Sequence, residues 1–188
     1  MDFGLLKTLC ETPGVPGVIG TKRGSDGPRV MLAAHIDEIG FIVKHIDDKG
    51  FVRLQPMGGW DPRNMVAQRV YLHTRSGERL IGALMPASKP IHMLTPEEAS
   101  KAPKIEEFFV DLGLGGDEVK GKVEIGDPVT MARTAEQIGH NVLSKTLDAR
   151  VAVYVMIAAL RQLREHRCEI VAVATTQEEV GLRGATTA

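Results

Sequence analysis

The sequence of 188 residues has few cysteines, few aromatic residues and no excess of charge of either sign. Its two cysteines, Cys10 and Cys168, are too few for a disulfide framework, so we expect reduced thiols in a cytoplasmic protein. The formal net charge of −1 gives no electrostatic attraction for a nucleic-acid backbone or an anionic membrane surface. Aromatic residues make up only 4%, which disfavours base-stacking surfaces.

Long apolar runs and common catalytic motifs are also missing. No run reaches the roughly 18 apolar residues that a membrane-spanning helix needs, and the N-terminal residues do not resemble a secretory signal. The segment Gly113-Leu114-Gly115-Gly116 lacks the Lys-Ser/Thr pair of a phosphate-binding loop. The chain is otherwise 43% hydrophobic and 25% charged, which is typical of a globular protein with one ordinary domain or two small ones. We therefore expect a globular protein that binds neither nucleic acid nor membrane.

The spacing of apolar residues changes along the chain. Residues 30–34 form a short run without alternation, which predicts a strand covered on both faces. Residues 150–166 have apolar side chains at helical spacing, and residues 170–174 form a second apolar strand. A helix followed by a buried strand is half of a β-α-β unit.

The middle of the chain has a different pattern. Short strand-like segments alternate with turns, and hairpin turns are expected at residues 47–50 and 75–77. Many short strands joined by turns are typical of a small sandwich or barrel. The sequence therefore predicts the α/β fold class: an α/β domain of residues 1–38 and 133–188, interrupted by an all-β, barrel-like insertion of residues 39–132.

Polar side chains follow both apolar strands and begin the long helix. They are His35, Asp37 and Glu38 after the first strand, Asp148 at the start of the helix, and Glu178 and Glu179 after the second strand. In open α/β sheets, ligands bind outside the carboxyl ends of the strands. We therefore expect these side chains at one edge of the sheet, although they lie far apart in the sequence.

An imidazole together with several carboxylates is a ligand set that zinc, cobalt or manganese binds. On a strand, His35 and Asp37 point to the same face, so Asp37 would accept the spare imidazole N–H and fix which nitrogen faces a metal. Glu178 and Glu179 are adjacent and point in different directions. One of them would bind a metal, and the other would stay free to take a proton from a water that the metal activates.

Each of these residues also has a simpler interpretation. His35 alone would be a polar loop residue, and Asp148 alone would be a helix N-cap. Glu178 and Glu179 would be a solvated pair of acids before a helix start. Spacing alone does not decide between a metal site and three unrelated polar features.

Four segments, in order along the chain, match motifs of one known family. They are residues 30–41 (VMLAAHIDEIGF), 89–98 (KPIHMLTPEE), 147–150 (LDAR) and 175–185 (TTQEEVGLRGA). With these segments the chain resembles the M42 family of metallo-aminopeptidases, which includes TET and glutamyl aminopeptidases and relatives labelled as endoglucanases. The resemblance covers nearly the whole chain.

The resemblance implies a metallopeptidase-type catalytic domain that removes N-terminal residues from peptides and holds two divalent metal ions, zinc or cobalt. By motif, His35, Asp148 and Glu179 would bind the metals, with Asp148 bridging both. Glu178 would be the general base, and Asp37 would orient His35. Residues 39–132 would serve in dimerisation, and we expect a homo-oligomer, from a dimer up to a dodecamer.

The chain also departs from the family pattern. Two further metal ligands, an Asp and a His, have no match, and we expect the catalytic domain to be incomplete at its C-terminus. Ala149 stands where relatives carry Asp or Asn. One alternative hypothesis is a truncated, inactive relative that acts as an oligomerisation or regulatory subunit. A second is a glycoside hydrolase, which would need two carboxylates facing each other across a sugar bond.

Overall fold

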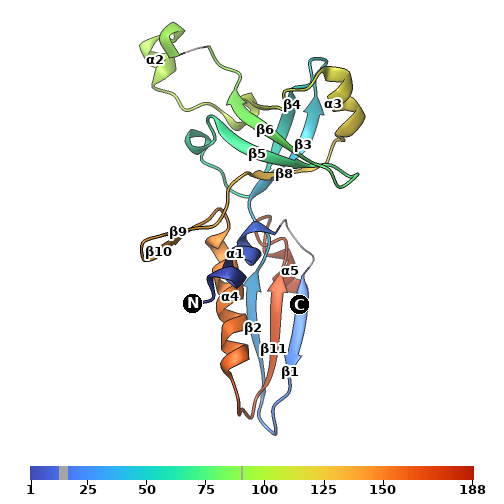
Figure 1. Cartoon of the computed structure of the whole chain (residues 1–188), viewed down its shortest axis with the longest axis vertical. Helices are drawn as coiled ribbons and strands as arrows, with labels where there is room; N and C mark the ends of the chain where they lie inside the picture. Colours follow the sequence, from blue (N-terminus) through green and yellow to red (C-terminus); the bar gives the residue numbers. More distant parts are fainter. Residues whose placement is uncertain (13–16, 90) are drawn as a thin grey trace. The chain divides into compact units, whose positions relative to one another are not determined.

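The computed structural model describes residues 1–12, 17–89 and 91–188, and the chain divides into two compact units. The α/β unit consists of Met1–Glu38 and Arg133–Ala188, and the barrel unit consists of Ile39–Ala132. Figure 1 colours both units along the sequence. Their bounds coincide with the positions at which the hydrophobic pattern changes.

The α/β unit is built on a three-stranded sheet with the order β1-β11-β2. Its elements are α1 (Phe3–Glu11), β1 (Val18–Lys22), β2 (Arg29–His35), β9 (Glu136–Ile138), β10 (Asn141–Leu143), α4 (Leu147–Gln162), β11 (Glu169–Thr175) and α5 (Arg183–Thr187). The central strand β11 is antiparallel to β1 and parallel to β2. The parallel register places His35 opposite Thr175, so β2 and β11 end together at their carboxyl ends.

Helix α4 and the sheet share one apolar cluster. Val153 and Met156 of α4 pack with Ala172 and Ala174 of β11 and with Ile36, the residue after β2. A second cluster joins buried residues of α1 to the start of the 133–188 segment. The α/β unit therefore buries its apolar side chains in two small clusters rather than in one large core.

The prediction that residues 30–34 are covered on both faces is wrong. Val30, Met31 and Leu32 keep 39%, 52% and 37% of their surface exposed. The reason is the position of β2, which pairs only with β11 among the described residues and so forms an edge of the sheet. An apolar run without alternation predicts burial on both faces only when neighbours cover the strand.

The barrel unit closes six antiparallel strands in the order β3-β4-β7-β6-β5-β8. Its elements are β3 (Gly40–Ile46), β4 (Val52–Met57), β5 (Gln68–His73), β6 (Arg79–Pro86), α2 (Pro96–Ala99), β7 (Phe108–Asp111), α3 (Gly116–Lys122) and β8 (Pro128–Met131), with 3-10 turns at Pro62–Asn64, Ile91–Met93 and Ile105–Glu107. Both expected hairpins are present, β3 with β4 and β5 with β6. In the first hairpin, Gly50 adopts φ +91°, and the Asp47 carboxylate accepts the backbone N–H groups of Lys49 and Phe51.

Fourteen buried apolar residues fill the barrel, and they form one continuous cluster. They are Phe41, Val43, Val52, Leu54, Met65, Val70, Leu72, Leu84, Phe108, Val110, Val119, Val123, Val129 and Met131. Most alternate along the strands with outward-facing residues, as the two-residue period of a strand requires. The barrel interior is therefore filled with side chains.

The helices differ from the sequence expectation at their ends. Helix α4 ends at Gln162 rather than near residue 166. At this end of the helix, the Lys22 ammonium donates to the carbonyl oxygens of Leu160 and Leu163 at 2.9 and 2.6 Å. Strand β1, helix α3 and the hairpin of β9 with β10 were not predicted, because each is short and lacks a clear period. No helix in the described part of the chain is long and apolar enough to span a membrane.

Candidate functional site

His35 ends β2, and its side chain retains 10% of its surface exposed. The next residue, Ile36, continues the strand pairing through its N–H, which donates to the carbonyl oxygen of Thr175 at 2.8 Å. The chain segments that carry His35 and the Glu178-Glu179 pair are thus joined at the point where both strands end. This is the sheet edge at which the sequence predicts a site.

Asp37 fixes the turn that carries the two glutamates. Its carboxylate accepts the backbone N–H of Glu178 at 3.3 Å and that of Glu179 at 3.2 Å, one on each oxygen. Gln177, just before them, has a positive φ of 59°, and this turns the chain sharply after β11. Both glutamates are therefore held by their backbone, and their side chains remain available.

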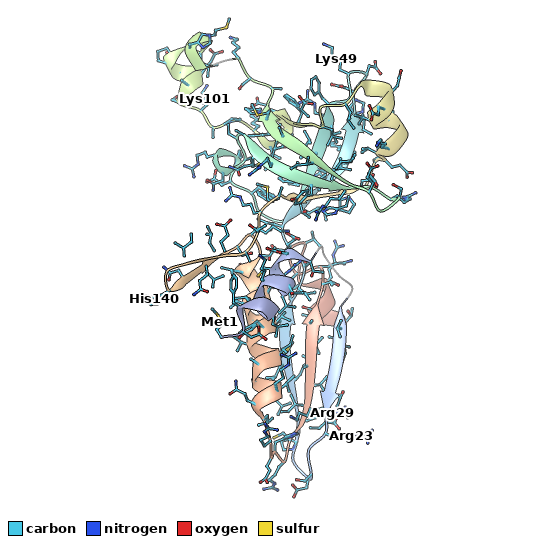
Figure 2. All side chains as sticks on the ribbon, in the orientation of Figure 1. Met1, Arg23, Arg29, Lys49, Lys101 and His140 are labelled. Atoms are coloured by element: carbon cyan, nitrogen blue, oxygen red, sulfur yellow. The ribbon has the colours of Figure 1, made fainter. Side chains whose placement is uncertain are left out.

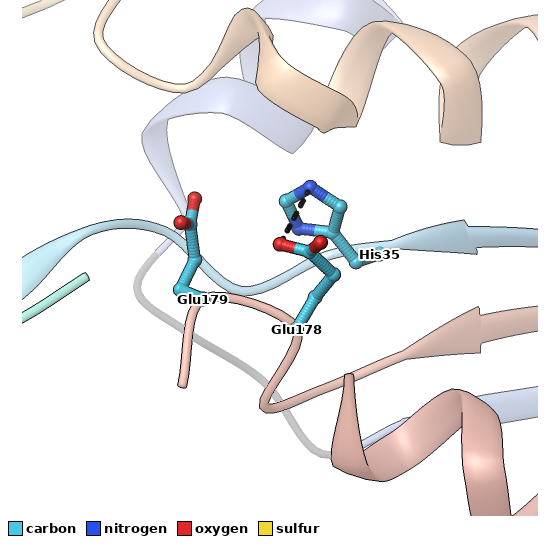
Figure 3. Close-up of side chains that lie close together, drawn as sticks. All are labelled: His35, Glu178 and Glu179. Atoms are coloured by element: carbon cyan, nitrogen blue, oxygen red, sulfur yellow. Dashed lines mark ion pairs between the residues drawn. The ribbon is translucent and has the colours of Figure 1, made fainter. Parts of the chain in front are cut away.

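The side chains of His35, Glu178 and Glu179 converge on one point. Each offers a ligand atom, and these atoms all lie within 4.8 Å of one another. The Nε2 atom of His35 lies 3.7 Å from Oε2 of Glu178. Figure 3 shows the Glu178 carboxylate against the imidazole ring and the Glu179 carboxylate beside it. Both glutamates reach the same space, so position alone does not separate a ligand from a base.

Asp148 approaches the same imidazole from the start of α4. Its Oδ1 lies 3.5 Å from Nε2 of His35, although 97% of its side-chain surface is exposed. Asp148 is not the N-cap, because that position belongs to Thr146. Asp148 and Ala149 have non-helical backbone angles, and the peptide bond between them is cis. All the sequence-predicted site residues thus lie around one imidazole.

The His35–Asp37 pair is looser than the sequence suggests. Nδ1 of His35 lies 3.5 Å from Oδ1 of Asp37 and is buried without a hydrogen bond to any described residue. The Asp37 carboxylate is directed instead to the two glutamate N–H groups. A small rotation of the ring would let Nδ1–H donate to Asp37 and leave Nε2 facing the acidic side chains.

Burial and neighbouring acidic groups affect the pKa of Glu179. Burial is the largest cause that raises the pKa of Glu179, and the nearby carboxylates of Glu178 and Asp37 raise it further. The imidazole of His35 acts in the opposite direction. Glu179 is therefore harder to ionise in the folded chain than in water, and a bound cation would remove much of this penalty.

A buried charged network supports the site, and sequence reasoning did not identify it. Arg150, which is 1% exposed, donates to the carbonyl oxygen of Ile36 at 2.8 Å and to two carbonyl oxygens around the end of α1. Glu38 pairs with Lys145 at 2.5 Å and with Arg150 at 3.5 Å. This network joins the start of α4 to the end of β2, the two elements that carry Asp148 and His35.

The sequence signal for this network was present but weak. Lys145 and Arg150 flank Asp148 in a segment that otherwise begins an apolar helix. Charged residues at such positions are usually exposed, so burial is not the default prediction. Burial lowers the pKa of Arg150, and Glu38 acts against this shift.

The side chains present fit a divalent metal. One imidazole nitrogen and several carboxylates held close together form the donor set that zinc, cobalt and manganese prefer. A glutamate left beside such an ion has the chemistry of a proton acceptor.

Comparison with known proteins places this geometry in a family context. The model of the M42 glutamyl aminopeptidase family matches residues 16–188. A lysyl aminopeptidase of Pyrococcus furiosus is 34% identical over 98% of this chain, and the putative aminopeptidase FrvX of Escherichia coli is 33% identical over all of it. The chain spans 62% and 60% of the length of these two relatives.

Solved structures have the same fold. A TET aminopeptidase from the marine sediment archaeon Thaumarchaeota archaeon SCGC AB-539-E09 superposes with a TM-score of 0.88 at 31% identity, and covers 98% of this chain and 61% of its own. The TET1 peptidase of Pyrococcus horikoshii has a TM-score of 0.84 at 24% identity, over 98% of this chain and 64% of its own, which shows the fold alone. That peptidase can assemble into a tetrahedron or a large octahedral shell.

Proposed function

Because the chain belongs to the M42 glutamyl aminopeptidase family, we propose that it takes part in metal-dependent hydrolysis of N-terminal residues from peptides. The observation that carries this proposal is the convergence of His35, Glu178 and Glu179 within 4.8 Å, with Asp148 at the same imidazole. Lysyl and glutamyl aminopeptidases are among its relatives, which supports a peptide substrate with a free amino end.

In the proposed site, His35 and Glu179 would hold a divalent metal through Nε2 and a carboxylate oxygen. Asp148, with an exposed side chain beside the same imidazole, would supply further carboxylate oxygens for the metal ions. Zinc or cobalt fits this mixed nitrogen and oxygen donor set. A metal bound there would supply a Lewis acid for the peptide carbonyl and would lower the pKa of a nearby water.

The other side chains move and hold protons. Glu178 takes a proton from the attacking water and passes it to the leaving amine, as a general base and then a general acid. Asp37 holds the backbone of both glutamates. After a small rotation of the His35 ring, Asp37 would also accept its Nδ1–H and keep Nε2 free for the metal. Arg150 and Glu38 keep the segment with Asp148 beside His35.

Self-association is part of the same proposal. The TET1 peptidase forms large shells, and we propose that this chain forms homo-oligomers in which residues 39–132 contribute to a dimer contact. The experiment is light scattering of the purified chain over a range of concentrations. A monomer at all concentrations would contradict this part and leave the site proposal unaffected.

The site proposal is tested by separating metal binding from turnover. Cobalt binding is followed by calorimetry, and hydrolysis of short peptides is followed with and without a chelator. We expect Glu178→Gln to keep cobalt binding and to lower turnover by about 10²–10⁴-fold, the range for loss of a general acid–base group. His35→Ala and Glu179→Gln should weaken cobalt binding.

The matched control is Glu106→Gln, which makes the same change at an exposed position of the barrel unit. It should alter neither readout. If Glu178→Gln hydrolyses peptides like the wild type, Glu178 is not the base. If Glu178→Gln instead loses cobalt while Glu179→Gln keeps it, the roles of the two glutamates are exchanged.

A further inference from the structure

The α/β unit has a second polar feature at the opposite end of its strands. A hollow of about 520 Å³ lies where the turn between β1 and β2 meets the connection between α4 and β11. It is lined by Arg23, Gly24, Ser25, Arg164, Glu165, His166 and Arg167. β2 and β11 each have seven residues between this end and the one at His35, so the two places are about 20 Å apart, at about 3.3 Å per residue.

The walls of the hollow are fixed against each other by the backbone. The N–H of Gly27 donates to the carbonyl oxygen of Arg167 at 2.8 Å, and the N–H of Glu169 donates to that of Pro28 at 3.0 Å. A Cβ atom at Gly24 would overlap the carbonyl oxygens of Arg167 and Cys168. The β1–β2 turn and the α4–β11 connection therefore pack backbone against backbone. The side chains that line the hollow project from these two fixed segments.

The positive charge in the hollow is only partly neutralised. Arg167 forms a two-pronged pair with Asp26, at 2.9 and 3.1 Å. Arg23, which is labelled in Figure 2, and Arg164 have exposed side chains and, within the described residues, no ion-pair partner. Glu165 is the one acidic residue in the lining. Two guanidinium groups thus remain for a ligand, against one carboxylate.

Two neighbouring features bear on the binding of an anion. The carboxyl end of α4 would repel negative charge through its free carbonyl groups, but Lys22 donates to the carbonyl oxygens of Leu160 and Leu163 and offsets this. The Nδ1 atom of His166 is bonded to the carbonyl oxygen of Cys168 at 2.7 Å. That bond uses the Nδ1–H of His166 and orients the imidazole in the wall of the hollow, so the donors for an anion come from the arginine side chains.

We propose that this hollow binds a small ligand through an oxyanion, a phosphate or a carboxylate group, held by Arg23 and Arg164. A guanidinium group pairs with both kinds of oxyanion through two parallel N–H donors. Ser25 lies in the same lining and offers a hydroxyl group. The site is separate from the residues around His35, and its existence does not depend on the proposed peptidase activity.

The experiment is a titration of the 15N-labelled chain with inorganic phosphate, and in a second arm with succinate, at constant ionic strength. We expect saturable shifts of the amide signals of Gly24, Ser25 and Arg167. Saturation by phosphate at lower concentration than by succinate identifies a phosphate-type ligand, and the reverse order identifies a carboxylate. Shifts that stay linear for both anions would overturn the proposal.

Variants locate the site. Arg23→Gln and Arg164→Gln change exposed side chains, so both should fold, and each should weaken binding about tenfold, which corresponds to about 1.4 kcal/mol. The matched control is Arg161→Gln, which removes the same charge from the exposed surface of the last turn of α4 without lining the hollow. Its affinity should stay close to that of the wild type. Equal weakening in all three variants would mean that only general charge attracts the anion, and the site would be rejected.

Discussion

The two units of the chain are stabilised by different means. The barrel unit closes its strands on themselves and buries one continuous apolar cluster. The α/β unit has a sheet with exposed apolar residues on β2, two small apolar clusters, and a fully buried arginine at the start of its long helix. The candidate site residues lie in the α/β unit, at strand ends that polar contacts hold in place. Closure thus favours a robust scaffold, whereas open strand ends provide room for reactive side chains.

The way the insertion joins the chain makes this comparison testable. The barrel begins with β3 and ends with β8, and these two strands pair, with Phe41 opposite Val129. The first and last residues of the barrel unit are therefore close together. Such an insertion is expected to fold without the domain that carries it.

The largest expected effect comes from separating the units. Residues 39–132 expressed alone should unfold cooperatively, with a stability of about 5 kcal/mol or more. Residues 1–38 joined to 133–188 by a short Gly-Ser linker should unfold at lower denaturant concentration. The only tryptophan, Trp60, stacks on Phe41 at 4.5 Å between ring centres, so its fluorescence reports the barrel alone. An unfolded barrel beside a folded α/β unit would reverse the comparison.

A cavity in the barrel core should have the next largest effect. Phe108→Ala removes a buried ring of β7 and should lower the free energy of unfolding by about 3–5 kcal/mol. The neighbouring Phe109→Ala is the matched control, because Phe109 is only partly buried. Urea unfolding followed by Trp60 fluorescence measures both. A similar loss in the two variants would show that inward packing is not what stabilises the barrel.

A change in the buried charged network should have a somewhat smaller effect. Arg150→Met keeps the size of the side chain but leaves Glu38 with Lys145 alone, and leaves the carbonyl oxygen of Ile36 without its donor. We expect a loss of about 3 kcal/mol in the α/β unit. Circular dichroism of helix content follows this unit.

The control for that variant is Arg161→Met, on the exposed surface of the same helix, which should change the stability by less than about 0.5 kcal/mol. Trp60 fluorescence should be unaltered in both variants. If Arg150→Met is as stable as the wild type, the α/β unit depends on its apolar clusters after all.

The smallest effect concerns pH. The pKa of Glu179 is raised in the folded chain, so the folded state binds a proton there more tightly than the unfolded state. The stabilisation of the folded state by protonated Glu179 is complete below the pKa of the unfolded chain. It is lost as pH rises through the pKa of the folded chain. In the presence of a chelator, Glu179→Gln should therefore be more stable than the wild type at neutral pH, and the difference should vanish on acidification. Denaturation at several pH values measures it, and a constant difference would contradict the shift.

Local signals allowed much of the fold to be predicted. The Asp47–Gly50 and Arg75–Gly77 turns define hairpins through residues that favour tight turns. Elements without such signals were missed, among them β1 and the β9–β10 hairpin. Burial of β2 was predicted incorrectly, because the pattern of a strand does not say how many neighbours it has.

The candidate site could be predicted in outline and not in detail. The rule that parallel strands end at one edge correctly brought His35 to Glu178 and Glu179. It could not reveal that Asp37 binds backbone N–H groups of the glutamates, because the rule places strand ends together and does not determine which groups each side chain contacts. The roles of metal ligand and base stay predictions for the experiments above.

The two backbone hydrogen bonds that Asp37 accepts have a consequence for redesign of the candidate metal site. Since the backbone at 178 and 179 is anchored by a third residue, either glutamate can be exchanged for another donor while the geometry of the turn is retained. Histidine at 179 would make the donor set softer, and aspartate would shorten its reach. Selectivity among transition metals could thus be changed by one substitution at a time, because Asp37 and not the exchanged side chain holds the backbone of the turn.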